Sequence, residues 1–205
     1  MKTPSGAITA YLHAKDGNRP HLLAQAFTDD ALLQMTVHTG AISFPPVSQG
    51  REAIADVLVR RFGQSYENVY TFCLASPPEE GAEMFRCDWL VAMTEKDSRA
   101  VRVGCGRYEW CFSPPSGLAE CLSITIEAMQ TLPALHLDKV MDWVAGLPYP
   151  WCPAAVALPA APDIEQLAPV LGYIGGTRMD SFPDGRFRAA RLRAAATAAS
   201  RPGPA

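Results

Sequence analysis

Hydrophobic and polar positions first follow a helical period along the chain. The stretch GAITAYLHAK predicts a helix that DGN ends, and its apolar stripe consists of Ile8, Tyr11, Leu12 and the stem of Lys15. A second helix is predicted from Pro20 to TDD, with an apolar face of Leu22, Leu23, Ala26 and Phe27. The segment REAIADVLVRRFG predicts a third, with Ile54, Val57, Leu58 and Phe62 at helical spacing.

Strand periodicity appears in ALLQMTVHTG, before the third helix, and dominates after it. Four more strands are predicted, separated by turn-rich segments: NVYTFCLAS, EMFRCDWLVAMT, AVRVGCGRYEWCF and LAECLSITIEAMQ. In the last of these, Leu122, Ile124 and Ile126 alternate with polar residues, as in an antiparallel sheet with one buried face. The order of elements predicts an α+β fold, in which a curved antiparallel sheet packs on the N-terminal helices.

The C-terminal third is punctuated by prolines. LDKVMDWVAGLPYPWCP predicts one more amphipathic turn or two, and a short helix is expected around Ile164 to Leu171. We expect a main domain over 1–147, a proline-rich segment over 148–177 that wraps around it, and a flexible basic tail over 178–205.

Charge and composition restrict the partners. The net charge of −3 does not attract nucleic acid or an anionic membrane. The tail from residue 178 has six arginines against two acids, so a nucleic-acid arm is an alternative, but Ala, Gly and Pro dominate it and no aromatic ladder accompanies the arginines. A solvated tail is the expectation there, and nucleic acid is not an expected partner.

Membrane and secretion signals are missing from the sequence pattern. No apolar run reaches the roughly 20 residues of a membrane helix, and MKTPSGAITAYLH lacks the apolar stretch of a secretory signal. We therefore expect a cytoplasmic protein with no membrane partner.

The six cysteines lie among apolar residues and include no CxxC pair. This pattern favours buried thiols over a disulfide framework or a zinc site. No metal and no cofactor are expected.

The stretch VGCGRYEWCF contains a Gly-x-Gly that could suggest a phosphate-binding loop. No helix follows it to present backbone amides to a phosphate, so a strand is the better interpretation. Gly104 and Gly106 would share one face with Tyr108, Trp110 and Phe112, where glycines let a sheet bend and leave space above it.

Three segments together resemble the nuclear transport factor 2-like superfamily, also called cystatin-like: AYLHAKDGNRPHLLAQAFTDDALLQM, QGREAI and VGCGRYEW, in this order. The resemblance covers roughly residues 6–130. This superfamily includes ketosteroid isomerases, scytalone dehydratases and SnoaL-like polyketide cyclases. The resemblance implies a cone-shaped α+β fold with a pocket.

Alignment with ketosteroid isomerases implies a partial match of their catalytic residues. Tyr11 lies where that family has the tyrosine that donates a hydrogen bond to the developing enolate. The position of the general base is Met35, and that of the protonated aspartate is Gly106, so both acids are missing. The likeness to scytalone dehydratases adds His13 as a second catalytic candidate.

Asp88 could be a buried acid in an apolar strand and hence a catalytic candidate. The alternation instead places it with Arg86, Arg107, Glu109 and Glu127 on the outer sheet face. Charges of mixed sign there predict a polar surface or a homodimer interface.

A hydrophobic pocket is predicted inside the cone. Its expected lining consists of Met35, Phe62, Trp89, Val91, Tyr108, Trp110, Leu122 and Ile124, with Tyr11 as the clearest polar group. The predicted function is binding of a small hydrophobic, polycyclic or carbonyl compound by a SnoaL-like protein, with isomerase, cyclase or dehydratase activity as the enzymatic hypothesis. The alternative is a non-catalytic ligand-binding or dimeric assembly module, and the side chains could also simply fill the cone.

Overall fold

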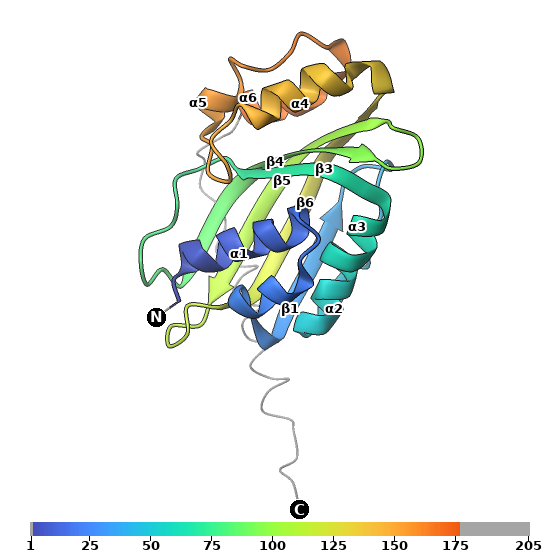
Figure 1. The fold of residues 1–205 in the computed structure, drawn as a ribbon. Coiled ribbons are helices and arrows are strands. Elements are labelled where there is room, and N and C mark those ends of the chain that lie inside the picture. Colours follow the sequence, from blue (N-terminus) through green and yellow to red (C-terminus); the bar gives the residue numbers. More distant parts are fainter. Residues whose placement is uncertain (1, 177–205) are drawn as a thin grey trace, which may run out of the picture.

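A curved six-stranded sheet organises residues 2–176, the part of the chain that the computed structural model describes (Figure 1). The strand order is β2-β1-β6-β5-β4-β3. The strands are β1 (Phe27–Val37), β2 (Val47–Gln49), β3 (Tyr66–Cys73), β4 (Met84–Glu95), β5 (Val101–Phe112) and β6 (Ala119–Leu132). The predicted α+β class is confirmed. The expected basic tail over 178–205 lies outside the described residues.

The sheet is mixed, whereas the sequence suggested an antiparallel one. Strands β3 to β6 form an antiparallel meander, but β1 runs parallel to β6, with Leu33 opposite Leu122 and Met35 opposite Ile124. A parallel pair needs a long crossover, and here everything between β1 and β6 supplies it. Periodicity within single strands carries no information about this pairing.

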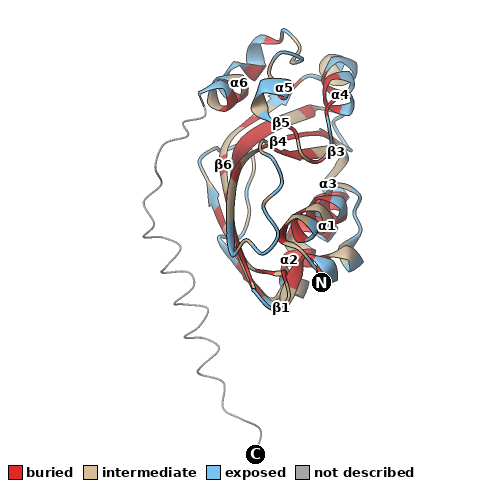
Figure 2. Ribbon diagram, turned by 90° about the vertical axis from the view of Figure 1, so that its left-hand side faces the viewer, coloured by how far each residue is buried: buried red, intermediate tan, exposed pale blue. Residues whose placement is uncertain are grey.

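The concave face of the sheet is covered by the N-terminal helices (Figure 2). Helix α1 (Pro4–Asp16) begins at Thr3, whose side chain accepts a hydrogen bond from the Gly6 N–H. The third predicted helix is continuous from residue 51 to residue 65, as α2 (Arg51–Ala55), a π-helical turn (Asp56–Arg60) and α3 (Arg61–Ser65).

The second predicted helix is only a 3-10 segment, Pro20–Gln25. Phe27, which the sequence placed on that helix, begins β1 instead. Its fully buried ring packs edge-on against Tyr11 and stacks on Trp110. Burial of this ring in the core outweighs the local helical pattern.

The C-terminal helices cover part of the convex face and form a second core. These helices are α4 (Leu137–Ala145), α5 (Ala154–Ala157) and α6 (Ala168–Gly175), with short 3-10 turns at Ala134–His136 and Glu165–Leu167. Under them lie Phe72, Leu90, Ala92, Val103 and Cys105 from β3, β4 and β5. The expectation of a polar outer face is therefore wrong for this half of the sheet, because both faces of the central strands are buried.

Asp88 lies at the border between this second core and the exposed half of the convex face. The Tyr173 hydroxyl of α6 donates to Asp88 Oδ1 at 2.9 Å, and Arg107 Nε lies 3.7 Å from the same oxygen. The predicted outward position of Asp88 is confirmed.

The cysteines differ in part from the expectation. Cys73, Cys87, Cys105 and Cys152 are buried thiols, as predicted. Cys111 and Cys121, which are opposite each other on β5 and β6, form a disulfide. The expectation of buried thiols was wrong for this pair, because the register of two strands, and not spacing along the chain, brings the cysteines together.

No helix among residues 2–176 combines the length and the apolar character that a bilayer crossing requires.

Candidate functional site

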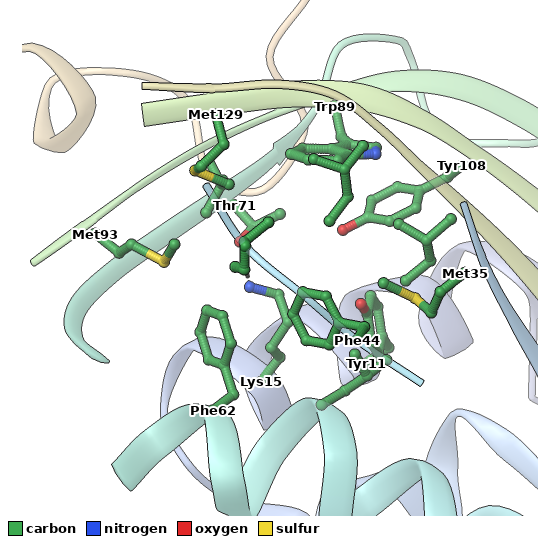
Figure 3. Close-up of a pocket in the computed structure, with 15 residues that line it drawn as sticks. Tyr11, Lys15, Met35, Phe44, Phe62, Thr71, Trp89, Met93, Tyr108 and Met129 are labelled. Carbon is green, nitrogen blue, oxygen red and sulfur yellow. Dashed lines mark hydrogen bonds between the residues drawn. The ribbon is translucent and has the colours of Figure 1, made fainter. Parts of the chain in front are cut away.

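A small cavity lies between the concave face of the sheet and the helices that cover it (Figure 3). Its volume is about 40 Å³. The helices contribute Tyr11, Lys15, Leu58 and Phe62, and the connection between β1 and β2 contributes Ile42 and Phe44. The sheet contributes Met35, Thr71, Trp89, Val91, Met93, Tyr108, Ile124, Ile126 and Met129.

Two tyrosine hydroxyls are the polar groups at one end of the cavity. The rings of Tyr11 and Tyr108 meet edge-on with centroids 6.1 Å apart, and their hydroxyls point toward the space between helix and sheet (Figure 3). Burial raises the pKa of Tyr11, and the neighbouring Tyr108 hydroxyl offsets this in part. Burial also raises the pKa of Tyr108. Both hydroxyls therefore keep their protons at neutral pH and can donate hydrogen bonds.

The Tyr11 hydroxyl is fully buried, and among residues 2–176 no atom meets it in hydrogen-bond geometry. The Tyr108 hydroxyl lies close enough to lower the pKa of Tyr11 as a hydrogen-bonding neighbour, but the two hydroxyls do not meet the geometry of a hydrogen bond. The indole N–H of Trp89, another lining residue, is likewise buried without an acceptor among the described residues. Unsatisfied buried donors are costly, so an acceptor that reached the Tyr11 O–H or the Trp89 N–H would be stabilising.

Lys15 is the third polar feature of the cavity and is only 7% exposed. Its ammonium donates to Thr71 Oγ1 at 2.7 Å and lies 2.8 Å from Asp16 Oδ1. The ring of Phe62 lies 4.6 Å from the same nitrogen. Asp16 does not line the cavity, and no Asp, Glu or His is among the lining residues. Within the described residues, no group of His, Cys, Asp and Glu side chains is arranged to hold a metal ion.

A larger hollow of about 390 Å³ adjoins this cavity. Ile42, Phe44 and Phe62 line both spaces, so these three side chains separate one from the other. Ile42 and Phe44 belong to an irregular connection and are only partly buried. The separating wall is thus the least constrained part of the cavity lining.

Most of the lining residues expected from the sequence do lie at the cavity: Met35, Phe62, Trp89, Val91, Tyr108 and Ile124. Trp110 and Leu122 face the same core but do not reach the cavity. Trp110 is fully buried by the rings of Tyr11, Phe27 and Phe112. The cone is filled on that side.

Of the two catalytic candidates, Tyr11 lines the cavity and His13 does not. His13 is exposed, and its ring stacks on Tyr149 with centroids 5.6 Å apart. Two residues of an α-helix correspond to a rotation of about 200°, which places His13 on the other side of α1 from Tyr11. His13 is therefore not part of this site.

The two glycines of VGCGRYEWCF do not leave open space, contrary to the expectation. A methyl group on Gly104 would lie 2.4 Å from Met129 Cε, and one on Gly106 would lie 1.9 Å from the Thr125 carbonyl oxygen. Met129 fills the first position, and the backbone of β6 and Trp89 fill the second. At Gly106 the register between β5 and β6 also shifts, so glycine here permits a close approach of two strands.

Lys15 and Thr71 are the polar lining residues that the sequence did not single out as functional. One signal was present, because Lys15 follows Tyr11 by four residues on the apolar stripe of the first helix. A lysine in such a stripe usually extends its head to solvent. Lys15 is enclosed only because β3 brings Thr71 against α1.

The helix order, the parallel return of β6 to β1 and the concave face that encloses the cavity decide the fold type. This arrangement agrees with the cone-shaped α+β fold that the resemblance to the nuclear transport factor 2-like superfamily implies. Neither protein-family models nor curated proteins match its sequence.

Solved structures with the nuclear transport factor 2-like fold are similar to this chain at low identity. They include a superfamily protein from Salmonella enterica (18% identity, 60% of this chain and 88% of that one, TM-score 0.48). A protein of ketosteroid isomerase-like fold from Catenulispora acidiphila has 16% identity over 60% of this chain and 85% of its own, with a TM-score of 0.46. An epoxide hydrolase/cyclase-like enzyme of pyran ring formation in salinomycin has 11% identity over 60% and 89%, with a TM-score of 0.44.

Proposed function

We propose that the cavity binds a small, largely apolar compound and orients it through an oxygen that accepts a hydrogen bond from Tyr11. The observation that carries this proposal is the Tyr11 hydroxyl, which is fully buried at the cavity and has no partner among the described residues. A ligand oxygen at this point would satisfy the donor, while the surrounding apolar side chains would contact the rest of the molecule.

The size of the cavity limits the ligand. A volume of about 40 Å³ corresponds to roughly one or two water molecules. Even a ligand with a single ring therefore requires the lining side chains to move and enlarge the cavity. Met35, Met93 and Met129 are unbranched and adaptable. Ile42 and Phe44 border the larger hollow, into which the cavity could extend. These features support a monocyclic ligand better than the polycyclic one expected from the sequence.

The chemistry of the lining supports binding and polarisation of an oxygen. A buried tyrosine with a raised pKa is a donor, and a carbonyl that accepts from it becomes more electrophilic. Proton abstraction would require a base, and neither carboxylate nor imidazole is among the lining residues. Isomerase, cyclase or dehydratase activity therefore remains a hypothesis without an assigned base. A homodimer through the exposed part of the outer sheet face also stays a prediction.

A pair of isosteric probes tests the proposal. Cyclohexanone carries one carbonyl acceptor, and methylenecyclohexane has the same shape without it. We expect cyclohexanone to bind more tightly, by about 3–10-fold, as measured by perturbation of amide NMR signals during titration. The variant Tyr11→Phe should lose this preference.

The matched control is Tyr70→Phe, which removes a hydroxyl from β3 at a position outside the cavity. This variant should retain the preference. If neither probe perturbs the signals of cavity residues, the cone does not bind such compounds and the proposal fails. Equal affinities for the two probes would remove the role of Tyr11.

A further inference from the structure

The surroundings of Lys15 carry a second inference, which rests on the proposed function and specifies the class of ligand. Lys15 lies in the last turn of α1, and its side chain extends into the cavity toward Thr71 (Figure 3). Thr71, on β3, is 1% exposed and receives the hydrogen bond from Nζ at 2.7 Å. The ammonium is therefore held in one place and does not extend to solvent.

The donors of this ammonium exceed its acceptors. An ammonium has three N–H groups, and among the described residues only Thr71 Oγ1 and Asp16 Oδ1 lie within reach of Nζ. The face of the Phe62 ring, 4.6 Å away, is a weaker partner. One N–H is left without an oxygen acceptor among the described residues, and it is available to an acceptor that enters the cavity.

The charge of Lys15 is already balanced. The Asp16 carboxylate lies 2.8 Å from Nζ and is 6% exposed. Its oxygens also accept hydrogen bonds from the Thr71 N–H at 2.7 Å, the Thr71 hydroxyl at 2.8 Å and the Tyr149 hydroxyl at 3.0 Å. Lys15 and Asp16 thus form a neutral, largely buried pair that is held from the side of Thr71 and Tyr149.

This balance discriminates between ligands by charge. An uncharged oxygen can accept the remaining N–H without changing the net charge of the site. A carboxylate would leave one uncompensated negative charge beside Asp16 in an apolar cavity, which is unfavourable. Lys15 here selects against anions, although a lone lysine would attract them.

Tyr11 and Lys15 are four residues apart on one helix, so their side chains start about 5–6 Å from each other on the same face. We propose that Lys15 is a second polar anchor of the cavity and that the ligand is an uncharged compound with two oxygen acceptors on opposite sides of a small ring, such as a cyclic dione or hydroxyketone. One oxygen accepts from Tyr11 and the other from Lys15.

Three probes test this proposal on the full chain: cyclohexanone, 1,4-cyclohexanedione and 4-oxocyclohexanecarboxylate. We expect the dione to bind roughly tenfold more tightly than cyclohexanone, beyond the statistical advantage of its two equivalent ends, because it adds a hydrogen bond from a charged donor. The oxocarboxylate should bind more weakly than cyclohexanone. Dissociation constants from NMR titration give both ratios.

The variant Lys15→Met should abolish the preference for the dione, and the matched control Lys139→Met, at an exposed position of α4, should retain it. Loss of one charge of a buried pair can unfold the protein. The double variant Lys15→Met with Asp16→Asn removes both charges and provides the same test if the single variant does not fold.

The outcomes separate this inference from the function on which it rests. If cyclohexanone binds but the dione shows no advantage, or if the oxocarboxylate binds most tightly, the role of Lys15 is overturned and the proposed function stands. If the dione keeps its advantage in the Lys15 variants, the inference is also overturned. If cyclohexanone itself does not bind, the proposed function fails first.

Discussion

The carboxylate of Asp16 accepts hydrogen bonds from both the backbone N–H and the hydroxyl of Thr71, at 2.7 and 2.8 Å, and so joins the end of α1 to β3. The same carboxylate neutralises Lys15. This contact links the stability of the cone to the polar group in its cavity.

We expect Asp16→Asn to lower the free energy of unfolding by about 3–5 kcal/mol, because Lys15 would be left as an unpaired charge in an apolar cavity. Urea denaturation measures this loss. Asp97→Asn, at an exposed turn, is the control and should change stability by less than about 0.5 kcal/mol. A loss no larger than that of the control would show that Lys15 reaches solvent.

Removal of the Tyr11 hydroxyl should stabilise the ligand-free protein. Because this hydroxyl is buried without a partner among the described residues, Tyr11→Phe is expected to raise the free energy of unfolding by about 1 kcal/mol. The comparison is Tyr149→Phe, which loses a hydrogen bond to a carboxylate and should cost about 1.5 kcal/mol. Thermal or urea unfolding of the two variants measures both changes in the free energy of unfolding. Similar losses in the two would mean that the Tyr11 hydroxyl is already satisfied.

The two glycines of β5 should respond differently to alanine. At Gly106 the new methyl group would meet the Thr125 carbonyl oxygen at 1.9 Å, and backbone cannot move aside without separating β5 from β6. At Gly104 the nearest atom is the flexible end of Met129. We expect Gly106→Ala to cost more than about 3 kcal/mol and Gly104→Ala about 1 kcal/mol, as measured by urea denaturation. The reverse order would contradict the close approach at Gly106.

Stability should depend on pH through Asp88. Burial raises the pKa of Asp88, and the Tyr173 hydroxyl and Arg107 offset this in part. The folded protein thus binds this proton more tightly than the unfolded chain does. The tighter binding of this proton stabilises the folded protein at low pH. This stabilisation is lost as the pH rises from 3.8, the ordinary pKa of aspartate, through the raised pKa of Asp88.

The variant Asp88→Asn isolates this effect, because asparagine does not titrate. Its free energy of unfolding relative to the parent protein should increase as the pH rises through that window and then level off. Urea denaturation at a series of pH values checks the sign. A difference that decreases with rising pH would mean that the ion pair with Arg107 outweighs burial.

Local periodicity predicted most single elements because each reflects burial of one face. The stripe that contains Tyr11 and Leu12 identified α1, and the alternation of Trp89, Val91 and Met93 identified the concave face of β4. The same alternation misjudged the convex face. Leu90 and Ala92 lie on that face, and only the packed C-terminal helices show what covers them.

The sequence by itself determined the class of fold, the strand character of VGCGRYEWCF and the position of Tyr11 on an apolar helix face, since these depend on neighbours a few residues away. The tertiary structure decided the parallel pairing of β1 with β6, the Cys111–Cys121 disulfide and the enclosure of Lys15 by Thr71. These features join residues that are far apart in the chain. Whether a lysine reaches solvent or remains in a cavity depends on what packs over it, and here that is a strand fifty-six positions away.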